Sequence, residues 1–165
     1  MTSMIRSLAA VAFAAALFSS AAFGAEDQAT LERTPSAPGA SVGFGNIADG
    51  DVVPPVFTVK FTISGMGIAP AGSQIPNTGH HHLLIDVDEL PDMNQPLPAN
   101  DHIRHFGKGQ TEAQLELTPG KHTLQLLLAD YRHVPHDPPV MSDRITITVS
   151  PDAAGATKDG EGDAQ

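Results

Sequence analysis

Cysteine and tryptophan are absent from this chain of 165 residues, and tyrosine occurs once. Without cysteine no disulfide can stabilise the fold, so stability must come from the burial of apolar side chains. The eight histidines are then the dominant reactive side chains of the sequence. Any site chemistry is therefore expected to depend on imidazole.

Basic residues are also scarce. Nine lysines and arginines stand against 19 aspartates and glutamates, and the formal net charge is -10. This balance argues against nucleic acid and against anionic membrane surfaces as partners. A negative chain attracts cations in a general way, but the charge alone indicates nothing beyond solubility.

Long apolar runs are absent after the first 24 residues. The run Leu8–Phe18 follows Arg6 and precedes a series of small residues, which is the order typical of a secretory signal peptide. It is too short to span a membrane. The sequence predicts a signal peptide over residues 1–24, cleaved after Gly24, with cleavage after Ala22 or Ala25 as the alternatives. It also predicts a periplasmic or secreted protein with no membrane span after cleavage.

Composition divides the remaining chain into three parts. Residues 25–40 contain two prolines and few large apolar side chains, so they are expected to form a flexible lead-in. Residues 151–165 are mainly glycine, alanine and acidic residues, and are expected to form a disordered acidic tail. One folded domain is predicted over residues 41–150, which is long enough for a real core.

Within residues 41–150 apolar and polar residues alternate, and this period of two indicates strands and not helices. Pro119-Gly120 between two of the runs predicts a hairpin turn. Strands are predicted near residues 41–47, 56–64, 80–87, 112–117, 121–130 and 143–150, with a further short strand near 102–106.

Six or seven antiparallel strands without helices predict an all-β fold, namely an immunoglobulin-like β-sandwich. A small β-barrel is the alternative fold. The core is expected to contain the apolar side chains of the alternating runs, which are Phe57, Phe61, Leu83, Ile85, Leu115, Leu124, Leu126, Leu128, Ile145 and Ile147.

Three consecutive histidines lead into one of the predicted strands. Side chains two apart on a strand share a face, so His80 and His82 project together, opposite to His81. Two imidazoles on one face are a recurrent metal-binding arrangement, and neutral imidazole is a good ligand for copper or zinc. A thioether nearby would favour copper. The predicted ligands are His80, His82, His105, His133 and His136, with Met141 as a weaker candidate.

Catalytic patterns are poorly supported, so a non-enzymatic role is favoured. No Gly-x-Ser-x-Gly turn frames a serine nucleophile, and no glycine-rich loop opens a helix. The spacing of His80, His82 and Asp86 loosely resembles the first metal-binding motif of cupins, with His122 after Pro119-Gly120 near the second. A cupin-like metalloenzyme therefore remains a less favoured alternative.

Five segments are specific enough to indicate a family: VGFGNIADGDVVPPVFTVKF, GMGIAPAG, NTGHHHLLID, HFGKGQTEAQLEL and PGKHTLQLLLADYRHVPHDPPV. Together they run from residue 42 to residue 140, most of the predicted domain, and they resemble a bacterial exported family of unknown function, DUF4399. The resemblance implies an exported single domain and supplies no catalytic mechanism. It draws attention to His80, His81, His82, His105, His122, His133 and His136.

Two functions are compatible with these observations. The first is an exported, histidine-rich β-sandwich that binds a transition-metal ion such as copper or zinc. The second is a non-enzymatic envelope module that binds a protein or an envelope polymer.

Overall fold

The computed structural model describes residues 31–155 of the chain. The predicted signal peptide and residues 156–165 of the predicted tail lie outside these residues. The described part contains β1 (Ser41–Phe44), β2 (Val52–Val53), β3 (Val56–Ser64), β4 (Gly67–Ile68), β5 (Thr78–Ile85), β6 (Ile103–His105), β7 (Glu112–Glu116), β8 (Gly120–Ala129), β9 (Ile145–Val149) and a 3-10 helix, η1 (Pro151–Gly155).

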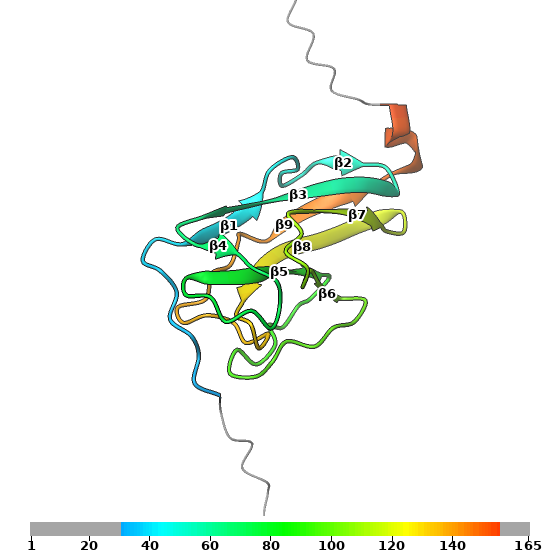
Figure 1. The fold of residues 1–165 in the computed structure, drawn as a ribbon. Coiled ribbons are helices and arrows are strands. Elements are labelled where there is room, and N and C mark those ends of the chain that lie inside the picture. Colours follow the sequence, from blue (N-terminus) through cyan, green and yellow to red (C-terminus); the bar gives the residue numbers. More distant parts are fainter. Residues whose placement is uncertain (1–30, 156–165) are drawn as a thin grey trace, which may run out of the picture.

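The strands form two sheets that pack as a sandwich (Figure 1). The smaller sheet has the order β1-β3-β7 and is antiparallel. The larger sheet has the order β2-β9-β8-β5-β4, and β6 also pairs with β5. Neither sheet closes on itself, so the predicted β-sandwich is confirmed and the alternative of a small barrel is wrong.

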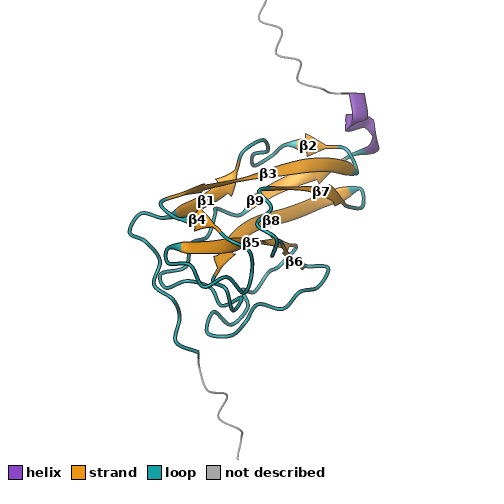
Figure 2. Ribbon diagram, in the orientation of Figure 1, coloured by secondary structure: helices purple, strands orange, loops and turns teal. Residues whose placement is uncertain are grey.

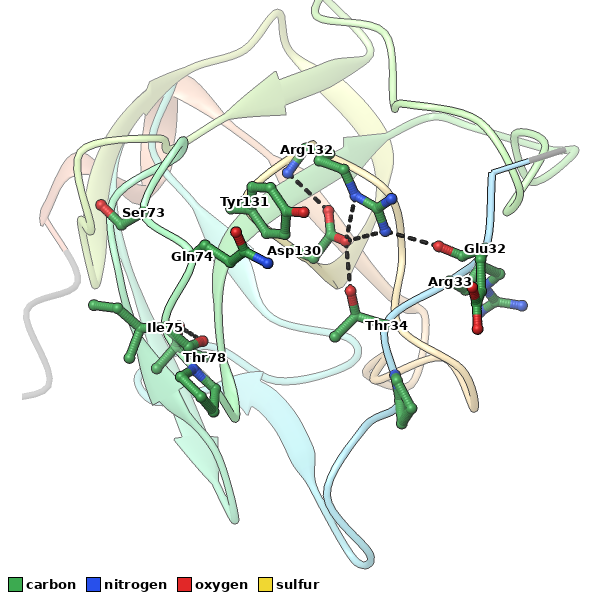
Figure 3. A pocket seen from close by; sticks show the side chains of 12 residues that line it. Glu32, Arg33, Thr34, Ser73, Gln74, Ile75, Thr78, Asp130, Tyr131 and Arg132 are labelled. Carbon is green, nitrogen blue, oxygen red and sulfur yellow. Dashed lines mark hydrogen bonds and ion pairs between the residues drawn. The ribbon is translucent and has the colours of Figure 1, made fainter. Parts of the chain in front are cut away.

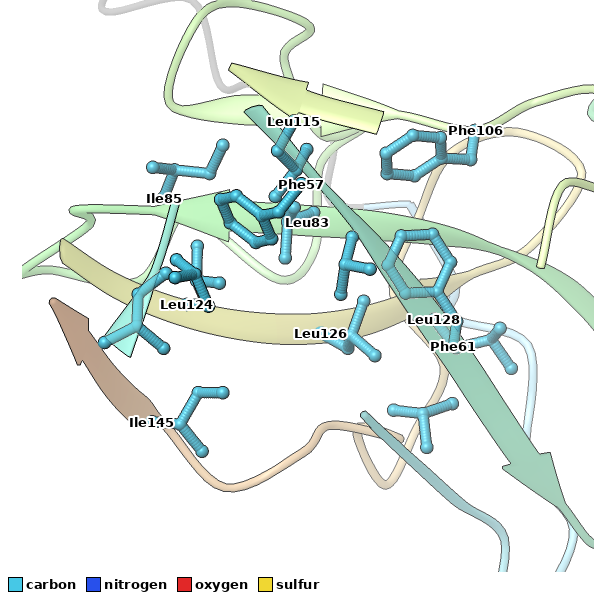
Figure 4. Close-up of a cluster of buried hydrophobic side chains, with 14 of the residues drawn as sticks. Phe57, Phe61, Leu83, Ile85, Phe106, Leu115, Leu124, Leu126, Leu128 and Ile145 are labelled. Carbon is cyan, nitrogen blue, oxygen red and sulfur yellow. The ribbon is translucent and has the colours of Figure 1, made fainter. Parts of the chain in front are cut away.

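The core lies between the two sheets (Figure 4). Phe57 and Phe61 of β3 meet Leu83 of β5 and Leu126 of β8, and all four are buried. Alternation along each strand places these residues on the inner face, since neighbouring side chains point to opposite faces. All ten predicted core residues belong to this cluster.

The outer face of the larger sheet is also covered, and this distinguishes β5 from an ordinary sandwich strand. Leu84 and Leu127 pack there with Leu97 and Ile103, which come from the long segment between β5 and β7. Figure 2 shows loops gathered on this side of β5. Seven of the eight residues of β5 are buried, because one face meets the core and the other meets the loops.

The structure differs from the sequence prediction in its connections. The predicted hairpin at Pro119-Gly120 is wrong, because β7 pairs with β3 whereas β8 pairs with β5 and β9, so this turn links the two sheets. Two strands of two residues each, β2 and β4, were not predicted, and they add parallel pairs to β9 and β5. Such short strands carry no alternating pattern that a sequence could show.

Residues 151–155, the first part of the predicted tail, form η1. Among the residues that the structure describes, no helix has the length and apolar character needed to cross a membrane.

Candidate metal centre

β5 fixes two of the predicted ligands. His80 and His82 lie on one face of the strand with their ring centroids 4.8 Å apart, as the alternation predicts. Their Cα partners on β8 are Ala129 and Leu127, whose side chains belong to the loop-covered outer face. Both histidines are fully buried, with 0% of their surface exposed. The β-sheet pairing therefore holds two imidazoles rigidly beneath the loops.

His105 joins this pair from β6, where it is the direct antiparallel partner of His82. Such cross-strand neighbours place their Cβ atoms close together on the same face. A Cβ on Gly107 would lie 2.2 Å from Cε1 and 2.3 Å from Nε2 of His105. The imidazole thus occupies the space that any larger residue at position 107 would need.

His133 reaches the same place from a turn after β8. It has a φ of 69°, a left-handed conformation that is uncommon for residues other than glycine. The side chain of Asp130 holds this turn by accepting hydrogen bonds from the backbone N–H groups of Arg132 (2.8 Å) and Val134 (3.1 Å). The backbone N–H of His133 donates to the carbonyl of Asp130 at 2.9 Å. Strained residues held by their surroundings often occur at functional sites.

The four rings form a compact group, called here the four-histidine cluster: His80, His82, His105 and His133. The ring of His80 lies 4.9 Å from that of His105 and 5.0 Å from that of His133. The ring of His82 lies 5.1 Å and 6.0 Å from the same two. The rings of His105 and His133 are 4.6 Å apart.

Three of the four imidazoles each bring one nitrogen close enough to share one ion. One nitrogen from each of His80, His82 and His105 lies within 4.8 Å of the other two. The Nε2 atoms of His105 and His133 are 3.1 Å apart. Two nitrogen ligands on one tetrahedral ion stand about 3.3 Å apart, given metal–nitrogen bonds of about 2.0 Å. Three imidazoles therefore meet the spacing of a metal site, and His133 contacts the third of them.

Both nitrogens of His80 and of His82 are buried and have no hydrogen-bond partner among the described residues. Unsatisfied buried polar atoms are rare in proteins and costly, so a group of them in one place requires an explanation. Coordination of a shared ion would account for one nitrogen of each ring.

Burial also keeps these rings neutral. The pKa of His80 is lowered to about 4, mainly by burial and then by the rings of His105 and His133. The pKa of His82 is lowered to about 2, again mainly by burial. The pKa of His105 is lowered by burial and by His133. Neutral imidazole is the form that binds a metal, so the cluster is ready to do so at neutral pH.

Residues 31–37 brace the turn that carries His133. They belong to the predicted lead-in, and they pack on the segment after β8, with Ser36 and Thr34 hydrogen-bonded through their backbones to Asp137 at 3.0 Å. The hydroxyl of Thr34 donates to Asp130 at 2.7 Å. Arg132 donates to Asp130 at 2.9 Å and to the carbonyl of Glu32 at 2.7 Å (Figure 3).

A pocket of about 520 Å³ lies on the other side of this brace. Its wall includes Asp130, Tyr131 and Arg132 from the turn (Figure 3). None of the four histidines lines it. The pocket therefore borders the turn of the cluster without opening onto its nitrogens.

The structure places two other predicted ligands elsewhere. His136 is buried, and its Nε2 lies 2.9 Å from where a Cβ on Gly79 would stand. Gly79 shares a face of β5 with His81, so His136 lies toward the side opposite to His80. Met141 pairs with Leu127 and packs in the outer apolar cluster, with β8 between it and β5. The four-histidine cluster is thus brought together without them.

His81 faces the core. Its ring lies 5.1 Å from that of Phe61, and both of its nitrogens are buried without a partner among the described residues. Burial lowers its pKa to about 4. It is packed as a core residue on the face opposite to the cluster.

The cupin-like set does not assemble. Asp86 lies just after β5, at the end of the strand away from the cluster, and accepts a hydrogen bond from Nδ1 of His122 at 2.7 Å. Nε2 of His122 faces the carbonyl of Thr118 at 2.8 Å. Asp86 and His122 therefore form a separate pair that pins the start of β8, and the open sheets provide no cupin barrel.

A family model described as "Domain of unknown function (DUF4399)" matches residues 59–150, which is more than half of the chain. The chain belongs to this family. Searches of the curated proteins and of the solved structures gave no match. The part of the chain that matches DUF4399 contains most of β3, all of β4 to β9 and all four histidines of the cluster.

Three contributions to the site in this DUF4399 protein were missed by the sequence analysis. Gly107 leaves space for the ring of His105, Asp130 shapes the turn of His133, and Thr34 secures Asp130. Gly107 stands two residues from a candidate ligand, and Asp130 three residues before another, so proximity was the only signal in the sequence. Nothing in the sequence indicates that residue 34 reaches residue 130.

Proposed function

We propose that this DUF4399 protein is an exported binding protein for a transition-metal ion such as copper or zinc. The four-histidine cluster holds the ion. His80 and His82 act as the fixed ligands from β5, and His105 and His133 close the site from β6 and the turn after β8.

The buried nitrogens of His80 and His82 carry this proposal. Four ring nitrogens in the interior have no partner among the described residues, and their two rings lie 4.9–6.0 Å from the rings of His105 and His133. A protein that used these histidines only for packing would gain stability by replacing them with apolar residues of similar shape. Ligation of an ion gives a reason to retain them.

The test is a titration of the protein purified without a tag and stripped of metal. Cu(I), Cu(II) and Zn(II) are each added in competition with a chelator of known affinity. At least one ion should bind with a Kd below about 10 μM, which corresponds to roughly -7 kcal/mol. The variant with both His80→Ala and His82→Ala should bind that ion at least about a hundredfold more weakly, because two of four ligands are lost.

Matched variants separate ligation from folding. His81→Leu alters the middle residue of the same run on the opposite face, so it should retain the parent affinity. His133→Asn removes a partly exposed ligand and keeps a residue that tolerates positive φ, so it should lose affinity while remaining folded. Equal binding by the parent and by all ligand variants would show that the cluster is structural.

Export is the second part of the proposal. It rests on Arg6, the apolar run Leu8–Phe18 and the small residues that follow. A periplasmic location gives a metal-binding domain access to ions that enter the envelope.

A further inference from the structure

We propose that the four-histidine cluster selects monovalent copper, Cu(I), over the divalent ions Cu(II) and Zn(II). This inference rests on the proposed metal-binding function and goes beyond it by naming the charge and the geometry of the bound ion.

The arrangement of the rings is the first argument. Cu(II) prefers four ligands at the corners of a flat square. In a square the two diagonal separations between ligands are about 1.4 times the four separations along the sides. Five of the six ring separations here lie between 4.6 and 5.1 Å, and only the His82–His133 separation is longer, at 6.0 Å. Four points with such separations form a tetrahedron. The cluster therefore suits an ion with a full d shell, either Cu(I) or Zn(II).

The charge around the cluster is the second argument. The metal-ligand group found among the described residues consists of imidazoles alone, with no carboxylate in it. The buried carboxylate of Asp130 is near enough to His80 to oppose the fall in its pKa. Arg132 pairs with that carboxylate at 2.9 Å and offsets its charge. The protein would thus leave the full charge of a bound ion uncompensated beside two fully buried histidines.

An ion whose charge is not compensated is less costly to bury when that charge is smaller. The free energy needed to move an ion out of water rises with the square of its charge. For a divalent ion it is about four times that of a monovalent ion of the same size. Zinc sites commonly include thiolates, carboxylates or a bound water that can lose a proton, and each of these lowers the net charge. A neutral set of four imidazoles has no such means, and Cu(I) is the tetrahedral ion that requires least compensation.

Hydrogen bonding to the ligands supports the same conclusion. Histidines that bind metals usually donate their second nitrogen to a carboxylate or a carbonyl, which strengthens them as ligands. Neither His80 nor His82 has such a partner among residues 31–155. No second hydrogen bond therefore strengthens these two rings as electron donors. This lowers the affinity for a divalent ion more than the affinity for a monovalent ion.

The test compares three ions on the same protein. Cu(I) is measured without oxygen in the presence of ascorbate, and Cu(II) and Zn(II) without reductant, each against a competing chelator. Cu(I) should bind at least tenfold more tightly than either divalent ion, which reverses the usual advantage of Cu(II) at nitrogen sites. A tenfold preference for Cu(I) over Cu(II) raises the reduction potential of the bound copper by about 59 mV, so voltammetry provides an independent readout.

A pair of variants tests the charge argument directly. Arg132→Gln leaves the carboxylate of Asp130 without its cation, so affinity for Zn(II) and Cu(II) should rise relative to Cu(I) by at least threefold. Arg33→Gln is the control, because Arg33 donates to the carbonyls of Pro135 and His136 but has no contact with Asp130 in the structure. A general loosening of this segment would lower the affinity for all three ions to the same extent in both variants.

The outcomes are distinct. Zn(II) or Cu(II) binding as tightly as Cu(I), or an Arg132→Gln variant with unchanged ratios, overturns the selectivity. Absence of binding tighter than about 10 μM for every ion overturns the proposed function itself.

Discussion

The three consecutive histidines of β5 are buried, and none of their six ring nitrogens has a hydrogen-bond partner among the described residues. Each unsatisfied buried polar group costs about 1–3 kcal/mol. The metal-free domain is therefore less stable than a version with apolar residues at these positions. Such a cost is common where a sequence keeps a binding site in place of an optimal core.

This burial gives the metal-free protein a defined response to acid. Imidazoles of the unfolded chain take up protons near pH 6.5. The native rings resist until about pH 4 for His80 and His81 and about pH 2 for His82. The unfolded state then binds more protons, so the free energy of unfolding should fall as the pH drops from 6.5 towards 4. Urea unfolding at pH 7.5, 6.5 and 5.0 measures this.

His122 contributes with the opposite sign. Burial alone would lower its pKa, but the hydrogen bonds to Asp86 and Thr118 outweigh burial and raise it. Its stabilisation is full below about pH 6.5 and is lost as the pH rises through its folded value. His122→Gln should therefore steepen the loss of stability in acid, and His81→Leu should reduce it. A parent protein equally stable at pH 5.0 and 7.5 would contradict the buried, neutral state.

Gly107 offers a way to disturb one proposed ligand, His105, without replacing it. In Gly107→Ala the new Cβ would overlap the ring of His105, and that ring can move because its outer edge is partly exposed. We expect metal affinity to fall at least about tenfold, or roughly 1.4 kcal/mol, with little change in the urea midpoint.

The matched control is Gly67→Ala, where the nearest atom to a new Cβ is Cγ2 of Thr78 at 3.4 Å, an ordinary contact. This variant should bind metal as the parent does. Unchanged affinity in Gly107→Ala would show that His105 does not serve as a ligand.

At the scale of the element, β8 supports both sides of β5. Leu126 of β8 is fully buried in the main core opposite Leu83. Leu126→Ala should reduce the free energy of unfolding by about 2–5 kcal/mol, the usual range for a buried leucine. Chemical denaturation of the metal-free protein measures this, and a cost below about 0.5 kcal/mol would place Leu126 on the wrong face.

Strands longer than two residues were predictable because alternation is a local signal. Val56–Ser64 and Gly120–Ala129 show it along their length, and the resulting inner faces agree with the structure. Local spacing also gave the shared face of His80 and His82. Pairing was less predictable, because the turn at Pro119 can equally begin a hairpin or a crossing between sheets.

The loops that complete the cluster were beyond local reasoning. Whether His133 or His136 faces β5 depends on a turn shaped by Asp130 and on a segment about 100 residues earlier in the chain, where Thr34 bonds to Asp130 with a separation of 96 residues. Contacts of this length follow from the packing of the whole domain and leave no periodic pattern in the sequence. The ligand set could therefore be proposed from the sequence, but the choice among its members needed the structure.

At the scale of the whole molecule, export predicts a shortened mature chain. The protein recovered from the envelope of the producing cells should lack about 24 residues at its N-terminus, because a signal peptidase removes the leader. Intact-mass spectrometry of this fraction measures the loss. A recovered protein that still begins at Met1 would contradict export by this route.

The division of the cluster between two fully buried histidines and two partly exposed ones determines how an ion would leave. His80 and His82 are fully buried and held by the pairing of β5 with β8, whereas His105 and His133 lie at the partly exposed rim. An incoming ligand from another protein would displace the rim histidines first, while the strand still holds the ion. Release would then proceed by stepwise exchange, so its rate would depend on the concentration of the acceptor.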